Sequence, residues 1–233
     1  MKLRALLFVA AALLAATSHT ARADEVDVAL VLALDVSLSV DEGEYQLQRD
    51  GIAEAFESPT LVAAIAGGTH HAIEVLVLEW SEPDQQIITV DWTRVSDAAS
   101  ARAFAAKVRP SRRSSTGRTA IGSALLAAAA AFERLPDKAA RRVIDVSGDG
   151  MANVGPPPAE VRDTLVAKGI TINGLVILDE EPWVDQYYDM NVVGGAGAFL
   201  MQVEDYRSFA AAIRQKLLSE LVALPPRPAA PPT

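Results

Sequence analysis

Three short segments of the chain place oxygen-bearing side chains next to stretches with a clear secondary-structure pattern. Asp35, Ser37 and Ser39 follow a strongly apolar run, Thr119 precedes an alanine-rich stretch, and Asp149 follows a second apolar run. All five side chains offer oxygen, which is the donor atom that a hard divalent cation such as Mg²⁺ prefers. The residue types therefore predict a metal site made of two carboxylates and three hydroxyl groups.

Neutral hydroxyl ligands leave much of the charge of a bound cation unneutralised. Mg²⁺ usually keeps several water ligands in a near-octahedral shell, and one of these waters can be exchanged for a carboxylate oxygen of a partner protein. A cage of four or five acids would bind the metal more tightly, but it would attract an anion only weakly. This donor set therefore favours capture of a partner.

Strand-like and helix-like patterns alternate along the chain. Apolar and β-branched stretches predict six strands, at residues 26–35, 71–80, 85–92, 142–146, 170–178 and 198–203. Helices are expected at residues 41–57, 96–108, 119–135, from 156 to about 168, and at 205–221. Only residues 81–84 join the second and third strands. These two should form an antiparallel hairpin, because a parallel return needs a dozen or more residues.

This order of elements predicts an α/β protein with three layers: a mostly parallel open sheet, one antiparallel hairpin strand, and helices on both faces. Such sheets bind ligands outside the carboxyl ends of their strands, near the point where the strand order reverses. Asp35 and Asp149 both follow predicted strands. The fold rule and the motif positions therefore indicate the same edge of the sheet.

The three segments resemble the metal-ion-dependent adhesion site of von Willebrand factor type A domains, whose pattern is Asp-x-Ser-x-Ser, a loop threonine and a later aspartate. The resemblance covers essentially the whole chain after the first 23 residues, and the chain is also similar to a group of bacterial secreted proteins built from this domain. It implies a Rossmann-like von Willebrand A-type fold in which Ser37, Ser39 and Thr119 hold Mg²⁺ or Mn²⁺. Asp35 and Asp149 would act directly or through water.

Each segment also has an alternative explanation that involves no metal. Ser39 begins the capping-box pattern Ser39-Val-Asp-Glu42 and could cap the following helix. Thr119 could cap the next helix, and residues 147–150 could form an ordinary turn. Thr116 is a competing hydroxyl three residues before Thr119. The correct order of all the segments, together with their positions at strand ends, favours the metal site over these separate explanations.

Arginines gather immediately before the threonine of the motif. Arg109, Arg112, Arg113 and Arg118 lie in one stretch without an acidic residue. They form either a basic rim that attracts an acidic partner or a set of solvated surface charges.

Aromatic residues follow the fifth predicted strand and should emerge at the same edge as the metal site. Residues 179–188 contain Trp183, Tyr187 and Tyr188. Exposed Trp and Tyr side chains favour an interface, whereas buried ones would form the core of a local turn. The sequence leaves both possibilities open.

The first 23 residues have the pattern of a cleaved secretory signal: Lys2 and Arg4, then an apolar stretch, then Ala21-Arg22-Ala23. A membrane anchor is disfavoured because the apolar stretch is shorter than the roughly 20 residues that span a bilayer. No other segment is long and apolar enough. The predicted organisation is a signal peptide at residues 1–23, a single domain at 24–222 and a disordered, proline-rich tail at 223–233.

The composition limits the classes of partner and the cellular compartments that suit this protein. The formal net charge is −9, and loss of the three basic residues of the signal would shift it to −12. Nucleic acid and anionic membrane surfaces are poor partners for such an acidic protein. The chain has no cysteine, and export without disulfides fits the bacterial periplasm. We therefore expect a periplasmic or secreted protein.

A metal-dependent hydrolase of the periplasm is the competing functional class. A haloacid-dehalogenase-type phosphatase would need an aspartate where Ser37 stands, and the Gly-x-Ser-x-Gly elbow of serine hydrolases is absent. His70 and His71 begin the second predicted strand, so they should lie at the opposite edge from Asp35. The sequence therefore predicts a non-enzymatic, Mg²⁺-dependent module that binds a protein partner through a carboxylate of that partner.

Overall fold

The computed structural model describes residues 24–179, 181 and 183–222. The predicted signal peptide at residues 1–23 and the predicted tail at 223–233 lie outside these residues. Among the helices that the structure describes, none is both long and apolar enough to cross a membrane.

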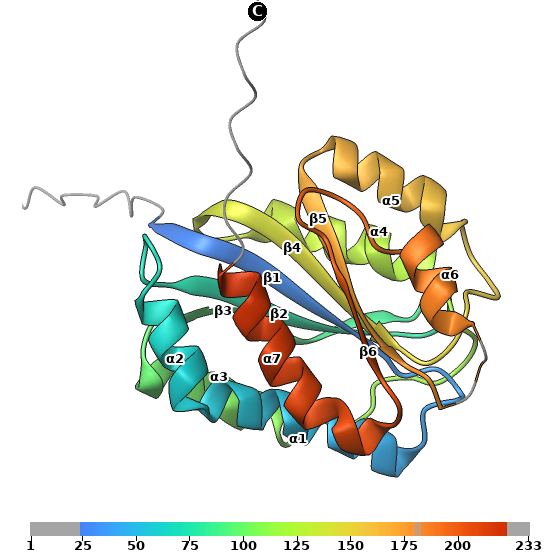
Figure 1. Cartoon of the computed structure of the whole chain (residues 1–233), viewed down its shortest axis with the longest axis horizontal. Coiled ribbons are helices and arrows are strands. Elements are labelled where there is room, and N and C mark those ends of the chain that lie inside the picture. The colour runs from blue at the N-terminus through green and yellow to red at the C-terminus, as the bar shows by residue number, and fades with distance from the viewer. Residues whose placement is uncertain (1–23, 180, 182, 223–233) are drawn as a thin grey trace, which may run out of the picture.

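A six-stranded sheet forms the centre of the molecule, with the strand order β3-β2-β1-β4-β5-β6 (Figure 1). The strands are β1 (Glu25–Asp35), β2 (Ile73–Trp80), β3 (Gln86–Val95), β4 (Lys138–Gly148), β5 (Ile170–Ile177) and β6 (Leu200–Val203). Neighbouring strands are parallel except for β2 and β3, which pair antiparallel. The predicted mostly parallel sheet with one antiparallel hairpin strand is thus confirmed.

Helices cover both faces of the sheet, so the predicted three layers are also confirmed. One face carries α1 (Glu42–Glu57), α2 (Pro59–Ala66), α3 (Ala98–Val108) and α7 (Phe209–Val222) (Figure 1). The other face carries α4 (Ile121–Ala131), α5 (Pro158–Ala167) and α6 (Val184–Asn191). Two 3₁₀ turns, η1 (Phe132–Arg134) and η2 (Tyr206–Ser208), follow α4 and precede α7.

The short helices α2 and α6 occupy segments for which the sequence pattern predicts no helix. Each has only eight residues, which is about two turns and too short for a clear 3.6-residue repeat. Helices of this length are stabilised by packing rather than by their own propensity. In α6 the buried Val184 and Tyr188 supply that packing, and in α2 it comes from Leu61 and Ile65.

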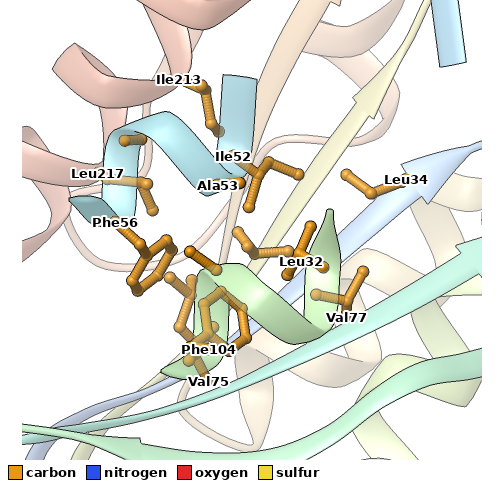
Figure 2. Packing of buried hydrophobic residues seen from close by; sticks show 14 of the residues in the cluster. Leu32, Leu34, Ile52, Ala53, Phe56, Val75, Val77, Phe104, Ile213 and Leu217 are labelled. Atoms are coloured by element: carbon orange, nitrogen blue, oxygen red, sulfur yellow. The ribbon is translucent and has the colours of Figure 1, made fainter. Parts of the chain in front are cut away.

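The central strand β1 fixes the position of the motif that follows it. Its side chains alternate between the two apolar clusters: Leu32 and Leu34 face α1 and α7, while Val31 and Ala33 face α4 and α5. Figure 2 shows Leu32 and Leu34 among residues of α1 and α7, including Ile52. Because a slip of one residue would exchange the two faces, the register is strongly determined.

The last helix carries a buried ion network that its amphipathic pattern does not reveal. Lys216 is fully buried, and its Nζ lies 2.6 Å from Asp145 Oδ1 and 2.7 Å from Glu220 Oε1. Asn173 Nδ2 also donates to Glu220 Oε1 over 2.9 Å. Burial by itself lowers the pKa of Lys216, but the two carboxylates outweigh this effect and raise it. The charged ammonium therefore ties α7 to β4, and Glu220 ties it to β5.

Among the described residues, Lys216 is the cation that contacts both carboxylates, so we expect Lys216→Met to lower the free energy of unfolding by about 3–5 kcal/mol at pH 8. Asp145→Asn keeps the pair between Lys216 and Glu220 and should cost less. Burial raises the pKa of Asp145 and Lys216 opposes that rise, so the Lys216→Met variant regains stability as pH falls and this carboxyl becomes neutral. Urea denaturation at pH 8 and pH 5 should show this smaller deficit at pH 5. Equal deficits at both pH values would contradict the network.

Candidate metal centre

The candidate site lies where the strand order reverses, between β1 and β4. The two strands run parallel, with Leu34 opposite Ser147, so Asp35 and Asp149 come to the same edge. A hydrogen bond from Ser39 Oγ to Asp149 Oδ1, 2.7 Å long, joins the loop after β1 to the loop after β4. The structure therefore places the predicted motif segments together, although they are far apart in the sequence.

The Asp-x-Ser-x-Ser loop is organised by hydrogen bonds among its own polar groups. Ser37 N donates to Asp35 Oδ1 over 2.7 Å, and the hydroxyls of Ser37 and Ser39 lie 3.2 Å apart. Asp35 and Ser37 are buried, and Ser39 is half-buried. With the bond from Ser39 to Asp149, four of the five predicted residues form one connected group.

Neither predicted helix cap is formed by a residue of the site. Asp41 caps α1: its Oδ1 accepts from Glu44 N over 2.8 Å, and Glu44 Oε2 accepts from Asp41 N over 2.7 Å. The capping box expected to begin at Ser39 is therefore wrong by two residues. Ala120 occupies the cap position of α4 and makes no side-chain cap bond, so Thr119 is not a cap either. The hydroxyls of Ser39 and Thr119 are therefore available for a role other than helix capping.

Thr119 lies beside the loop that follows β4. It is buried, and Asn153 holds its backbone through bonds of 2.9 and 3.0 Å. Its Oγ1 would be 3.8 Å from a β-carbon at Gly150, the residue after the aspartate of the motif. Thr116, the competing hydroxyl, is exposed and accepts from the guanidinium of Arg113 over 3.3 Å. Of the two threonines, Thr119 is thus the one next to the site.

The two carboxylates are desolvated and close enough to affect each other. Burial and the charge of Asp149 raise the pKa of Asp35 to about 8. Burial also raises the pKa of Asp149, while hydrogen bonds from Ser39 and Tyr206 oppose that rise. Among the described residues, Asp35 Oδ2 is buried without a hydrogen-bond partner. Two buried carboxylates, an unpaired oxygen and adjacent hydroxyls fit a hard divalent cation, whose charge would offset their repulsion.

Over residues 24–179, 181 and 183–222, no three His, Cys, Asp or Glu side chains are grouped so that they could hold a metal. The candidate centre has only two carboxylates, so most of its oxygen donors would be hydroxyls. It is therefore unlike a histidine-rich or carboxylate-rich metal site.

Two buried residues that the motif does not include hold the site from the helices. The Tyr206 hydroxyl donates to Asp149 Oδ2 over 3.0 Å. Gln48 Nε2 donates to the carbonyl of Asp35 over 3.2 Å, and Gln48 Oε1 accepts from Ser147 Oγ over 3.3 Å. The pattern places Tyr206 on the apolar face of the last helix, and a buried tyrosine hydroxyl needs a polar partner. That requirement was the only sequence signal for this contact.

Close packing at Gly148 brings a second tyrosine to the site. A β-carbon there would lie 2.5 Å from the Tyr188 hydroxyl and 2.9 Å from Asp35 Oδ2, so only glycine fits. Tyr188 is fully buried, and burial together with the charge of Asp35 raises its pKa well above the usual value. Trp183, by contrast, is 68% exposed. The aromatic segment is therefore partly core and partly surface.

Arg113 holds the backbone of the motif loop. Its guanidinium donates to the carbonyl of Val36, with 2.8 Å from Nη2, and also to the carbonyl of Ser37. These bonds place a positive charge beside Asp35, where it lowers the pKa of that carboxyl against the larger effect of burial. Arg113 is thus a structural part of the site as well as a local charge.

The other arginines of this stretch are mostly paired. Arg109 lies 2.7 Å from Glu57, and Arg118 lies 3.0 Å from Glu82, while Arg112 is exposed. The predicted basic rim is therefore smaller than the sequence suggests.

The histidines lie at the opposite edge of the sheet, as predicted. His70 and His71 precede β2, whose first residue, Ile73, pairs with Val28 near the beginning of β1. At the other end of the same pairing, Trp80 lies opposite Asp35.

Replacing Arg113 by methionine should remove charge-assisted bonds to two carbonyls of the motif loop. We expect the free energy of unfolding to fall by about 1–3 kcal/mol. Arg112→Met is the matched control, because the neighbouring side chain is exposed, and its effect should stay within about 0.5 kcal/mol. Urea denaturation of both variants measures the difference. Similar values for the two would show that Arg113 does not hold the loop.

Comparisons with known proteins agree with this architecture. The family described as "Protein of unknown function (DUF1194)" matches residues 25–225, whereas no curated protein matches the chain. Proximal thread matrix protein 1 from the mussel byssus superposes with a TM-score of 0.60 at 17% identity, over 85% of this chain and 48% of that one. This chain thus spans about half of that protein. One structure of the mussel protein has a zinc-occupied MIDAS motif.

Two bacterial structures have the same fold. A von Willebrand factor type A protein from Catenulispora acidiphila has a TM-score of 0.59 at 17% identity, over 83% of this chain and 42% of that one. The conserved hypothetical protein BatB from Bacteroides thetaiotaomicron has a TM-score of 0.51 at 20% identity, over 83% and 98%. The chain has the von Willebrand A-type fold.

Proposed function

We propose that this chain, which belongs to the DUF1194 family, is an exported module that binds a protein partner through a divalent cation. In this proposal Asp35, Ser37, Ser39, Thr119 and Asp149 hold Mg²⁺ or Mn²⁺. The observation that carries it is the hydrogen-bonded group formed by Asp35, Ser37, Ser39 and Asp149, in which both carboxylates are buried. The zinc-occupied motif of the mussel protein supports a divalent cation at this edge of the fold.

Some residues of the site would balance the charge of the cation, and the others would complete its coordination shell. Asp35 and Asp149 together balance the charge of a divalent cation, and the three hydroxyls add oxygen donors without further charge. Arg113 then leaves one positive charge over beside the motif loop. A bound cation would supply an electrophilic centre for one carboxylate oxygen of the partner. Tyr206 and Ser39 would orient Asp149 through its two oxygens.

The location of the protein is part of the same proposal. Residues 1–23 act as a signal peptide and direct the chain to the periplasm or outside the cell, and residues 24–222 form the binding domain. The partner is a protein rather than nucleic acid, because the formal net charge of −9 repels polyanions.

The arrangement favours binding over catalysis. General acid–base catalysis requires a proton-transferring group within hydrogen-bond reach of the reacting atoms. In the described structure, the histidines lie at the far edge of the sheet, and the carboxylates beside the serine hydroxyls are the proposed ligands of the cation. We therefore propose that the module is not an enzyme.

Mg²⁺ or Mn²⁺ should raise the melting temperature of the protein without its signal peptide, because a ligand that binds only the folded state stabilises it by mass action. At a metal concentration one hundred times Kd the gain is about 2.7 kcal/mol, or roughly 5–10 °C for a domain of this size. Asp35→Ala and Asp149→Ala should abolish the rise. Differential scanning fluorimetry with and without metal measures it.

Asp163→Ala is the control for the metal experiment, since this carboxylate is exposed on α5. It should keep the full rise. If titration calorimetry of the wild-type protein detects no heat of binding at millimolar Mg²⁺ or Mn²⁺, the proposed ligand set is wrong.

No hydrolytic turnover is expected with Mg²⁺ present, because the proposed metal would occupy the carboxylates beside the serine hydroxyls and the described histidines lie at the far edge of the sheet. Phosphate monoester, carboxylic ester and peptide substrates should all react at the background rate. The opposing outcome is turnover that needs metal and disappears in Ser37→Ala, which would favour a periplasmic hydrolase.

A further inference from the structure

Two large apolar side chains are exposed around the candidate metal centre. Leu38 is 74% exposed and Trp183 is 68% exposed. Large apolar residues at the surface are unremarkable when scattered, but these two come from different loops, each of which contacts a loop that carries a residue of the polar site. We call them the apolar flanks.

Leu38 stands inside the motif itself, between Ser37 and Ser39. Its backbone N donates to the carbonyl of Gly117 over 2.8 Å, which joins the motif loop to the loop that carries Thr119. While the serine hydroxyls turn inward to the carboxylates, the Leu38 side chain points outward to solvent. The first apolar flank is therefore held beside the hydroxyl donors.

Trp183 lies on the side of Asp149. Glu181 Oε2 accepts a hydrogen bond of 3.0 Å from Met151 N, so the loop after β5 lies beside the loop after β4. Trp183 follows in the chain and begins α6, and Tyr187 N donates to its carbonyl over 3.0 Å. The second apolar flank is therefore next to the carboxylate side of the centre.

The backbone of Trp183 adopts a conformation that disfavours its side chain. Its φ is 70° and its ψ is 9°, the left-handed region that costs a non-glycine residue free energy. The exposed ring recovers little of this cost by packing. Strain of this kind gathers at functional sites, and here it keeps an aromatic side chain at the surface.

Charge distinguishes the two sides of the centre. Arg113 adds a positive charge beside the motif loop, whereas Asp179 and Glu181 are exposed on the Trp183 side. An acidic side chain of a partner is attracted to the first side and repelled from the second. The group that meets Trp183 should therefore not be acidic, and an apolar side chain would cover the ring.

From these observations we infer the chemistry of the partner: a segment with one acidic residue directly followed or preceded by a large apolar residue. The acidic side chain approaches the centre near Arg113, and the apolar side chain packs on Trp183. This inference rests on the proposed function, because it assumes that the carboxylate is bound through the metal.

The first test distinguishes the effect of backbone strain at Trp183 on stability from the effect of the Trp183 side chain on binding. Trp183→Asn places a residue that tolerates the left-handed region where tryptophan is strained. The melting temperature should rise by about 2–4 °C, and the Mg²⁺-induced rise should persist, while binding to an apolar-flanked acidic peptide falls. A variant that loses both stability and binding would show that Trp183 has a packing role, and this would overturn the inference.

Binding is measured with three synthetic peptides immobilised on a biosensor: Gly-Leu-Asp-Phe-Gly, Gly-Leu-Asn-Phe-Gly and Gly-Ser-Asp-Ser-Gly. With Mg²⁺, the first should retain wild-type protein at least about tenfold more than the others. Trp183→Asn and Leu38→Ser should each reduce that retention about tenfold. Met190→Ser is the matched control, because Met190 is 65% exposed at the far end of α6, next to α5, and should change nothing.

The outcomes distinguish this inference from the proposed function. If the two aspartate peptides are retained equally while Mg²⁺ binding is intact, the inferred role of the apolar flanks is wrong. The proposed metal centre is unaffected by that result. Absence of Mg²⁺ binding would overturn both. Light scattering with Mg²⁺ adds a third check: a dimer that forms in the wild type and disappears in Trp183→Asn would show that a second copy covers Trp183, contrary to the inference.

Discussion

The burial of two neighbouring carboxylates is the constraint on which the rest of the site depends. The parallel pairing of β1 with β4 brings Asp35 and Asp149 to the same edge of the sheet, where burial and mutual repulsion disfavour their charged forms. The surrounding groups compensate in part. Ser37 N binds one carboxylate, and the hydroxyls of Ser39 and Tyr206 bind the two oxygens of the other.

These hydrogen bonds do not satisfy both carboxylates fully, and the oxygen that remains unpaired supports a functional role for the site. Among the described residues, Asp35 Oδ2 is left without a donor. A purely structural site would be expected to pair such an oxygen, because an unsatisfied buried carboxylate oxygen is costly. A β-carbon at Gly148 would lie 2.5 Å from the Tyr188 hydroxyl and 2.9 Å from this oxygen, so the strand ends are closely packed here. The unpaired oxygen supports the proposed cation at this edge of the sheet.

The buried carboxylate of Asp145 has a different environment from those of the site. Asp145 lies within β4, four residues before Asp149, and it contacts a cation, the ammonium of Lys216. Glu220 shares that cation and is also bound by Asn173. The carboxylate of Asp145 is therefore paired with a cation of the chain, whereas among the described residues Asp149, just after the strand, makes no such ion pair. This contrast over four residues supports a role for Asp149 beyond folding.

Much of the fold could be predicted from the sequence because it depends on local patterns. The apolar runs gave the strands, the four-residue connection gave the antiparallel hairpin, and the motif order gave the edge at which the polar residues meet. The errors also have local causes. Both Ser39-x-x-Glu42 and Asp41-x-x-Glu44 satisfy the capping pattern, and only the backbone conformation at Asp41 decides between them. The eight-residue helices α2 and α6 are too short to show a repeat.

What the sequence by itself determined was the set of oxygen donors and the architecture that gathers them, since residue type and periodicity are properties of the chain alone. Tertiary structure decided which groups surround those donors. Tyr206 reaches the carboxylate of Asp149, and Gln48 reaches the backbone carbonyl of Asp35, from helices that meet the site only after folding. Arg113, whose role the sequence leaves open, donates to two backbone carbonyls of the motif loop. Lys216 reads as a polar position on an amphipathic helix, yet it is buried because Asp145 faces it from the sheet. Such pairings depend on the distance between elements that are remote in sequence, and no local pattern records that distance.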